Sequence, residues 1–141
     1  EKIKKNFDKV DIVLSPAMGG VVVGYIIGKY LETQSIFAER VNGKLTLRRG
    51  FKIKKNTNVL IVEDVITTGK SVLECSNIIK INKANLLGYA CIIDRSEKDI
   101  SIKDNIVSQM EFKIKTFEAS KIPEDLKSIE PTELGSRNLS K

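Results

Sequence analysis

The stretch Val59-Leu60-Ile61-Val62-Glu63-Asp64-Val65-Ile66-Thr67-Thr68-Gly69-Lys70-Ser71 decides how the rest of this chain is interpreted. Its first four residues form a continuous apolar run, which is typical of a parallel strand covered on both faces. Two adjacent carboxylates, Glu63 and Asp64, come directly after this run. In open α/β sheets, ligands bind in the crevice beyond the carboxyl ends of the strands. The stretch therefore predicts a binding site at the end of a buried strand.

The carboxylates and the turn that follows them suit two parts of a phosphorylated sugar. Neighbouring acids repel each other, and a pair of hydroxyl donors or a shared hard cation such as Mg²⁺ relieves that repulsion. Residues 67–71 offer hydroxyl groups, backbone N–H groups and a glycine. A helix-like pattern follows (Val72, Leu73, Cys75, Ile78, Ile79), so its positive end faces the turn. We interpret the stretch as an anion site rather than as a strand before an ordinary N-capped helix.

The stretch resembles the signature of the type I phosphoribosyltransferases, which use phosphoribosyl diphosphate (PRPP). The glycine-to-lysine spacing excludes a Walker A loop. Within the superfamily, the chain is most similar to the orotate phosphoribosyltransferases. The similarity is supported by segments over nearly the whole chain: Ser15-Pro16-Ala17-Met18-Gly19-Gly20, Phe37-Ala38-Glu39-Arg40, Leu45-Thr46-Leu47-Arg48-Arg49-Gly50-Phe51, Asp94-Arg95-Ser96 and Gly135-Ser136-Arg137.

This resemblance implies transfer of the phosphoribosyl group from PRPP to orotate, giving orotidine 5′-monophosphate and pyrophosphate in pyrimidine nucleotide synthesis. Glu63 and Asp64 would contact the ribose hydroxyls, and Arg40 would reach the pyrophosphate from a mobile loop. The 5′-phosphate and the rest of PRPP would be held by Val65, Ile66, Thr67, Thr68, Gly69, Lys70, Ser71, Ala17, Met18 and Gly19. Thr67 and Arg95 would bind orotate, and Mg²⁺ would be the cofactor. The family's shared active sites imply a homodimer.

Several of these segments have a simpler interpretation from the residues alone. Residues 15–20 also fit an ordinary turn between a strand and a helix. Asp94 and Arg95 also fit an exposed ion pair, which contributes little to stability. Arg40, Arg48 and Arg49 also fit a solvated charged loop, and the last two enter the site only by their proximity in sequence.

Repeated strand–helix–strand order predicts an α/β fold with a doubly wound, mainly parallel sheet and flanking helices. We expect strands at residues 10–14, 35–39, 59–62 and 85–93, and helices at residues 21–31 and after residue 71. Asn42-Gly43 is a strong hairpin signal between residues 37–41 and 44–48. Residues 111–116 alternate like an edge strand, and a polar tail follows Ile122.

The length of 141 residues and the hydrophobic content of 41% suit one domain. Residues 1–5 have the pattern of the middle of an amphipathic helix and lack a starting methionine. We therefore expect a single catalytic domain over residues 1–141 that is truncated at its N-terminus and lacks an N-terminal hood. In the family, this hood contributes to the orotate pocket.

The net charge of +6 comes from lysines that are scattered rather than interleaved with aromatic residues. This pattern favours a solvated surface over nucleic-acid binding. Cys75 and Cys91 lack metal-ligand spacing, histidine is absent, and no metal-binding residues are predicted. Both cysteines are typical of buried free thiols in the cytoplasm. The apolar run at residues 21–27 is too short to span a bilayer.

Two alternatives remain open. A purine or other base phosphoribosyltransferase would keep the residue 59–71 stretch but change the base pocket. A regulator on the same fold would bind PRPP without catalysis and contact nucleic acid, for which a coherent basic face or an added module is the expected sign.

Overall fold

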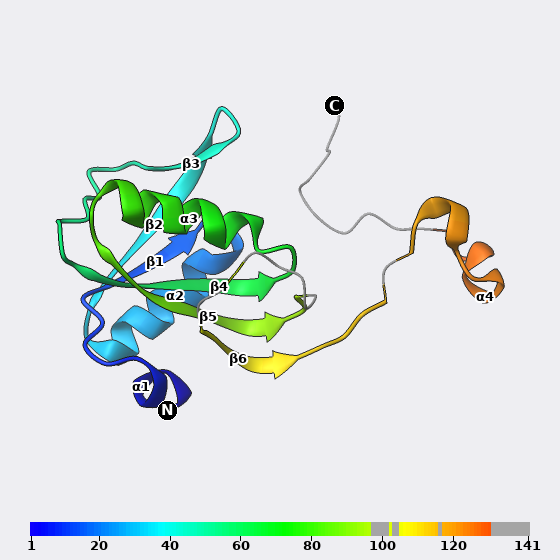
Figure 1. The fold of residues 1–141 in the computed structure, drawn as a ribbon, viewed down its shortest axis with the longest axis horizontal. Coiled ribbons are helices and arrows are strands. Elements are labelled where there is room, and N and C mark those ends of the chain that lie inside the picture. Colours follow the sequence, from blue (N-terminus) through cyan, green and yellow to red (C-terminus); the bar gives the residue numbers. More distant parts are fainter. Residues whose placement is uncertain (97–101, 103–104, 116, 131–141) are drawn as a thin grey trace.

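A six-stranded sheet forms the centre of the computed structural model, which describes residues 1–96, 102, 105–115 and 117–130 (Figure 1). Its spatial order is β3-β2-β1-β4-β5-β6. Every neighbouring pair is parallel except the antiparallel hairpin of β2 and β3. The strands are β1 (Ile12–Pro16), β2 (Gln34–Val41), β3 (Lys44–Leu47), β4 (Asn58–Ile66), β5 (Asn85–Asp94) and β6 (Ile106–Glu111). The predicted α/β class and the predicted hairpin are confirmed.

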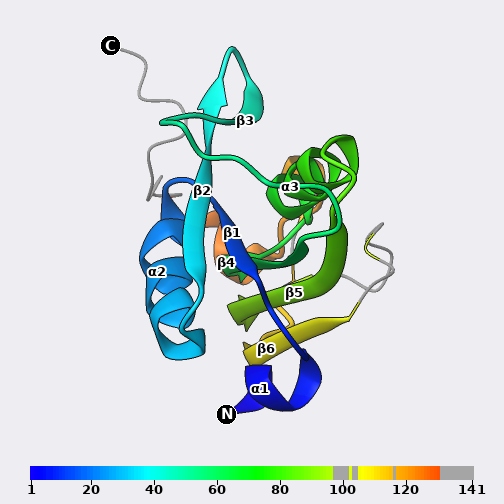
Figure 2. The same cartoon turned by 90° about the vertical axis from the view of Figure 1, so that its left-hand side faces the viewer.

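Helices cover both faces of this sheet. In Figure 2, α2 (Gly19–Leu31) lies on one side of the strands and α3 (Lys70–Ile81) on the other. A short N-terminal helix, α1 (Lys2–Asn6), lies near β6, and the chain after β6 includes a 3₁₀ turn (Ala119–Lys121) and α4 (Glu124–Lys127). No helix within the described residues is both long enough and apolar enough to cross a membrane.

Alternation along the central strands builds a separate core under each helix. On the α3 side, Leu14 and Ile61 pack with Cys75 and Ile79 of the helix. On the α2 side, Val13 and Leu60 pack with Val23 and other apolar residues of that helix. Continuous apolar strands of this kind need cover on both faces, as the residue pattern predicts.

Glycines let α2 approach the sheet closely. Gly20, Gly24 and Gly28 are the buried residues of this helix and recur every four positions, on one face. A Cβ on Gly24 would lie 2.0 Å from the Ser15 Oγ atom of β1, so a larger residue does not fit there. The face of α2 that packs on the sheet therefore presents backbone at these glycines with the half-buried Val23 and Ile27 beside them, whereas Val22, Tyr25 and Ile26 point outward.

The chain leaves β1 and β4 at the same edge of the sheet and turns toward opposite faces. β1 and β4 are adjacent and parallel; β1 continues into α2, and β4 continues into α3 (Figure 2). A crevice opens at such a point in doubly wound sheets. The strand order therefore places the loop after β1 beside the loop after β4.

Three predicted boundaries are wrong. β1 spans Ile12–Pro16 rather than residues 10–14. β4 continues to Ile66, because Glu63 and Val65 still pair with Cys91 and Ile93 of β5. The acids therefore lie within the last part of the strand rather than beyond it. The edge strand was expected at residues 111–116, but it begins at Ile106 and ends at Glu111. It lies earlier in the chain because the apolar residues at its start pack against the core. Gly135-Ser136-Arg137 lies outside the described residues.

Candidate active site

A pocket of about 770 Å³ occupies the crevice beyond β1 and β4. Four segments supply its walls: the loop after β1, the end of β4, the turn into α3, and the β2–β3 hairpin. The lining residues are Pro16, Ala17, Met18, Gly19, Arg40, Gly43, Glu63, Asp64, Val65, Ile66, Thr67, Thr68, Gly69, Lys70, Ser71 and Val72. All the PRPP-binding and catalytic residues predicted from the sequence are among them. Arg95 is the one predicted residue that the pocket lining does not include.

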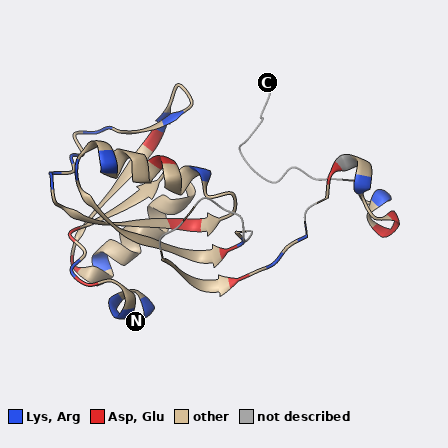
Figure 3. Ribbon diagram, viewed as in Figure 1, with Lys and Arg blue, Asp and Glu red and all other residues tan. Residues whose placement is uncertain are grey.

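The two acids of β4 enter the pocket side by side. Glu63 is 8% exposed and Asp64 is half-buried. The Asp64 N–H donates to Glu63 Oε1 at 3.1 Å, and the Val65 N–H donates to Asp64 Oδ1 at 2.8 Å. These local bonds orient both carboxylates, and a carboxylate can accept several hydrogen bonds or bind a cation. Figure 3 shows acidic residues at the carboxyl ends of β4, β5 and β6, along the edge that carries the pocket.

The turn after β4 exposes the N-terminus of α3 to the pocket. Gly69 is the N-cap residue, has a φ of 73° and provides no side-chain cap. The Lys70 N–H lies 3.4 Å from Thr68 Oγ1, which is a long contact. The side chains of Thr67, Thr68 and Lys70 are exposed. The positive end of a twelve-residue helix and several hydroxyl groups therefore face the same space, as an anion site requires.

A second helix N-terminus faces the pocket from the other side of the sheet. α2 begins at Gly19, after the N-cap residue Met18, and no side-chain bond caps it. The loop before it contains a cis peptide between Ala17 and Met18, and its Ala17 N–H donates to the Ala38 carbonyl at 2.8 Å. Two helix dipoles thus point into one cavity, which suits a ligand with two separate anionic groups.

Arg40 is the basic residue of the hairpin that reaches the pocket. Its Nη1 atom donates to the Gly43 carbonyl at 2.6 Å and to Glu74 Oε1 and Oε2 at 3.2 and 3.0 Å. Glu74 belongs to α3, so Arg40 lies on the α3 side of β2. Among the described lining residues, Arg40 and Lys70 carry the positive charges.

Arg49 points elsewhere. Its guanidinium donates to both carboxylate oxygens of Glu39, at 2.8 and 3.0 Å, and lies 5.8 Å from the centre of the Phe37 ring. The hydrogen bond from Arg49 lowers the pKa of Glu39. Neither Arg48 nor Arg49 is among the described residues that line the pocket. Of the three arginines around the hairpin, the structure brings only Arg40 to the site.

Arg95 lies beside the site rather than in its wall. Its backbone N–H donates to the Ile66 carbonyl at 2.8 Å, which places it next to the start of the turn at Thr67. Its side chain is exposed. The neighbouring Asp94 uses Oδ1 to accept from the Ser96 N–H at 2.8 Å. The structure therefore brings Arg95 near Thr67 without an ion pair to Asp94 among the described contacts.

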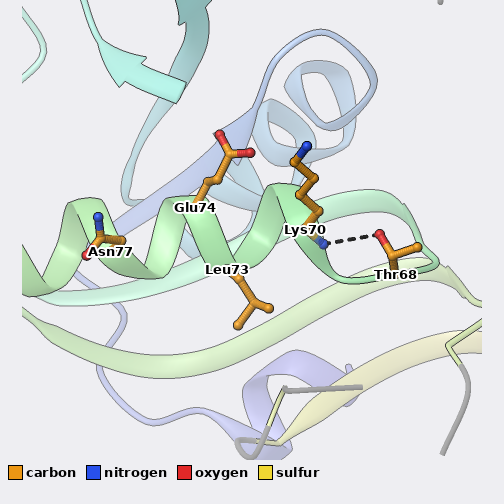
Figure 4. A pocket seen from close by; sticks show the side chains of 5 residues that line it. All are labelled: Thr68, Lys70, Leu73, Glu74 and Asn77. Atoms are coloured by element: carbon orange, nitrogen blue, oxygen red, sulfur yellow. Dashed lines mark hydrogen bonds between the residues drawn. The ribbon is translucent and has the colours of Figure 1, made fainter. Parts of the chain in front are cut away.

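Sequence reasoning missed Glu74 and Gly43. Glu74 accepts from Arg40 and also from the Leu45 N–H, at 3.0 Å. It lines a second, open pocket of about 660 Å³ along α3 with Thr68, Lys70, Leu73 and Asn77 (Figure 4). Because its partners lie about 30 residues away in the chain, no local pattern points to it.

The profile of the phosphoribosyl transferase domain family matches residues 1–126. The orotate phosphoribosyltransferase of Bartonella henselae is 39% identical over 99% of this chain and 72% of its own length. That of Methylorubrum extorquens is 41% identical over 100% of this chain and 72% of its own length.

Solved structures share the fold at lower identity. The orotate phosphoribosyltransferase of Aeropyrum pernix is 20% identical with a TM-score of 0.62, covering 74% of this chain and 62% of that one. An adenine phosphoribosyltransferase is 17% identical with a TM-score of 0.65, covering 75% of this chain and 72% of that one.

Proposed function

This chain belongs to the phosphoribosyl transferase domain family and, within it, to the orotate phosphoribosyltransferases, and from this premise we propose how its pocket works. The chain is a pentosyltransferase that transfers the phosphoribosyl group of PRPP to orotate, a step of pyrimidine nucleotide synthesis. The products are orotidine 5′-monophosphate and pyrophosphate. One observation carries the residue assignment: the acid pair of β4 and the uncapped starts of α2 and α3 line a single pocket.

PRPP has a phosphate at one end and a pyrophosphate at the other, and the pocket offers a matching site for each. In our proposal, residues 65–71 and the start of α3 bind the 5′-phosphate. Ala17, Met18 and Gly19, at the start of α2, bind the pyrophosphate, and Arg40 donates to it. Glu63 and Asp64 accept hydrogen bonds from the two ribose hydroxyls between these ends. The ribose then lies over the end of β4.

Catalysis rests on positioning and on electrostatics. As the bond from the ribose C1 atom to pyrophosphate breaks, positive charge develops on the sugar and negative charge on the leaving group. The carboxylates of Glu63 and Asp64 favour the first charge, and Arg40 with the α2 N-terminus favours the second. The fixed ribose also presents its C1 atom to the incoming orotate nitrogen, which reduces the entropic part of the barrier. No covalent enzyme intermediate is required.

Mg²⁺ fits this pocket as a cation bound largely through the substrate. Within the described part of the chain, no cluster of three or more acidic, cysteine or histidine side chains could hold a metal. Mg²⁺ characteristically binds one or two carboxylates together with phosphate oxygens and waters, and Glu63 and Asp64 supply that number. When bound, the cation supplies charge neutralisation at the pyrophosphate. Chelation by EDTA should abolish turnover, and excess Mg²⁺ should restore it; turnover that survives EDTA would contradict this assignment.

We assign orotate to the side of the pocket near Thr67 and Arg95. The guanidinium of Arg95 suits the carboxylate of this pyrimidine, because it donates two parallel hydrogen bonds. The proposal is supported by the Arg95–Ile66 backbone bond, which holds Arg95 beside Thr67. A purine would leave such a charged donor unpaired, so a base without a carboxylate should react poorly.

We also propose that the enzyme works as a homodimer with shared active sites, in the cytoplasm. Val22, Tyr25 and Ile26 project from the outer face of α2, and the adjoining Met18 is 83% exposed in the pocket wall. A second copy would cover this apolar face. It would also bring further basic groups to a pocket whose described lining has two, Arg40 and Lys70. The buried free thiols of Cys75 and Cys91 suit a reducing compartment.

The test of function is a base panel with PRPP and Mg²⁺. Orotate, uracil, adenine and hypoxanthine are supplied separately, and pyrophosphate release is measured. We expect turnover with orotate at least about a hundredfold above the other bases, because a carboxylate partner of Arg95 is missing from each of them. Faster turnover with a purine would overturn the assignment.

Light scattering of Ile26→Glu and of the unmodified protein tests the dimer. A dimer that this substitution leaves intact would exclude the α2 face as the interface.

A further inference from the structure

Glu74 connects two groups of the β2–β3 hairpin, the Arg40 guanidinium and the Leu45 N–H, to α3. Its Oε2 atom accepts from Arg40 Nη1 at 3.0 Å and from the Leu45 N–H at 3.0 Å, and Oε1 accepts from Arg40 Nη1 at 3.2 Å. Arg40 and Leu45 face each other across the hairpin, so one carboxylate holds both strands. The same Nη1 atom also donates to the Gly43 carbonyl at the hairpin turn. The contact therefore fixes the hairpin and the arginine together.

The geometry leaves part of the guanidinium available to a ligand. Every described side-chain hydrogen bond of Arg40 uses Nη1, and the side chain is 41% exposed in the wall of the pocket. Nε and Nη2 make no hydrogen bond within the described residues. Guanidinium groups bind phosphate oxygens through two parallel donors, which Nε and Nη2 provide on one edge.

We propose that Glu74 is a positioning residue for PRPP: it holds Arg40 by Nη1 so that the remaining edge of the guanidinium meets the pyrophosphate. This inference rests on the proposed function and extends it to a residue outside the large pocket. Glu74 does not touch the substrate and acts only through Arg40. Figure 4 shows its side chain on the same side of α3 as that of Lys70, with Leu73 on the opposite side.

The negative charge of Glu74 indicates that this residue positions Arg40 rather than attracts the ligand. A carboxylate beside an anionic ligand is electrostatically unfavourable, so Glu74 must contribute through the geometry that it gives to Arg40. Its amide analogue keeps an oxygen acceptor of the same reach and removes the negative charge. With its carbonyl oxygen in the place of Oε2, glutamine would keep one hydrogen bond from Arg40 and the one from Leu45 and lose the bond from Arg40 to Oε1, whereas Glu74→Ala would remove all three. This difference separates a positioning role from a charge effect.

The test measures KM for PRPP, KM for orotate and inhibition by pyrophosphate in Glu74→Ala, Glu74→Gln, Arg40→Ala and the Glu74→Ala/Arg40→Ala double variant. We expect Glu74→Ala to raise KM for PRPP and Ki for pyrophosphate about tenfold, with KM for orotate within about twofold. Glu74→Gln should stay within about threefold of the unmodified protein. In the Arg40→Ala background, removing Glu74 should add less than about twofold, because its only path to the substrate is already lost.

Glu39→Ala is the matched control, because Glu39 pairs with Arg49 in the same hairpin but outside the pocket. It should change KM for PRPP by less than about twofold. Equal effects of Glu39→Ala and Glu74→Ala would overturn the inference, as would additive effects of the Glu74 and Arg40 substitutions. So would an Arg40→Ala variant with normal KM for PRPP.

Thermal melting of each variant checks folding. If Glu74→Ala does not fold, Glu74→Asp and Glu74→Gln decide the question. We expect the shorter aspartate to impair PRPP binding and the glutamine to retain it; the reverse order would show that the charge matters and would overturn the inference. Activity of the unmodified protein on orotate is measured first, so a missing activity identifies failure of the proposed function itself.

Discussion

The carboxylate of Asp64 lies directly against the backbone of Gly19, where β4 meets the start of α2. A Cβ on Gly19 would lie 2.4 Å from Asp64 Oδ2 and 2.7 Å from its Cγ. Glu63 makes the same kind of approach to Gly20, where a Cβ would lie 2.9 Å from Oε1. The absence of side chains at both glycines allows the two acids to lie beside the positive end of α2.

This arrangement predicts that Asp64→Asn reduces turnover without unfolding the protein. The amide keeps the size of the side chain but removes the charge that favours the developing cation. We expect kcat to fall at least about tenfold, with a melting temperature within a few degrees of the unmodified protein. Steady-state kinetics and thermal melting measure both quantities. Asp8→Asn, at an exposed site, is the control, and normal kcat in Asp64→Asn would remove the role assigned to Asp64.

Gly19→Ala should impair catalysis, whereas Gly24→Ala should reduce stability. The methyl group at position 19 would displace the Asp64 carboxylate, so we expect about a tenfold loss in kcat/KM for PRPP and a small change in stability. At position 24, the methyl group would meet Ser15 Oγ at 2.0 Å within the α2 packing face. Overpacking there should lower the free energy of unfolding by roughly 1–3 kcal/mol. Urea unfolding and kinetics of both variants distinguish the two effects; equal stability losses would contradict this account.

Arg95→Lys should weaken orotate binding specifically. Lysine keeps the positive charge but cannot donate two parallel hydrogen bonds to a carboxylate. We expect KM for orotate to rise roughly tenfold and KM for PRPP to stay within about twofold. Arg48→Lys provides the control, because Arg48 is not among the described pocket residues. An equal rise in both KM values for Arg95→Lys would place Arg95 outside the orotate site.

The two cysteines should be unreactive in the folded protein and should make stability depend on alkaline pH. Burial raises the pKa of Cys91 to about 12, and burial together with the nearby Glu63 charge raises the pKa of Cys75. Iodoacetamide at pH 8 should modify neither thiol until urea is added.

The sign of the pH effect follows from proton binding. The ordinary pKa of a cysteine thiol is about 9. Above that pH, the folded state keeps thiol protons that the unfolded chain releases. The free energy of unfolding should therefore fall as pH rises above 9, by up to about 1.4 kcal/mol per pH unit for each thiol. Urea unfolding at pH 8 and pH 10.5 measures this slope, which Cys91→Ala should reduce. An unchanged slope in that variant would contradict the predicted contribution of Cys91.

Much of the fold could be predicted because its determinants are local in the chain. The apolar run before Glu63 and the helical pattern after Gly69 reflect burial on one strand and on one helix face. The edge strand was misplaced for the opposite reason. Residues 111–116 alternate, but Phe112 and Ile114 are exposed, whereas Ile106 and Val107 pack against the cores. Which segment pairs with β5 depends on neighbours far away in sequence.

The sequence by itself determined that two carboxylates and a glycine turn come at the end of a buried strand, because residue order alone sets such a motif. Only the tertiary structure decided which basic residue joins them. Arg40 and Arg49 are equally charged, yet one meets Glu74 on α3 and the other meets Glu39. The face on which a side chain lies follows from strand register, and its partner follows from packing between elements distant in the chain. The local sequence determines neither the face nor the partner.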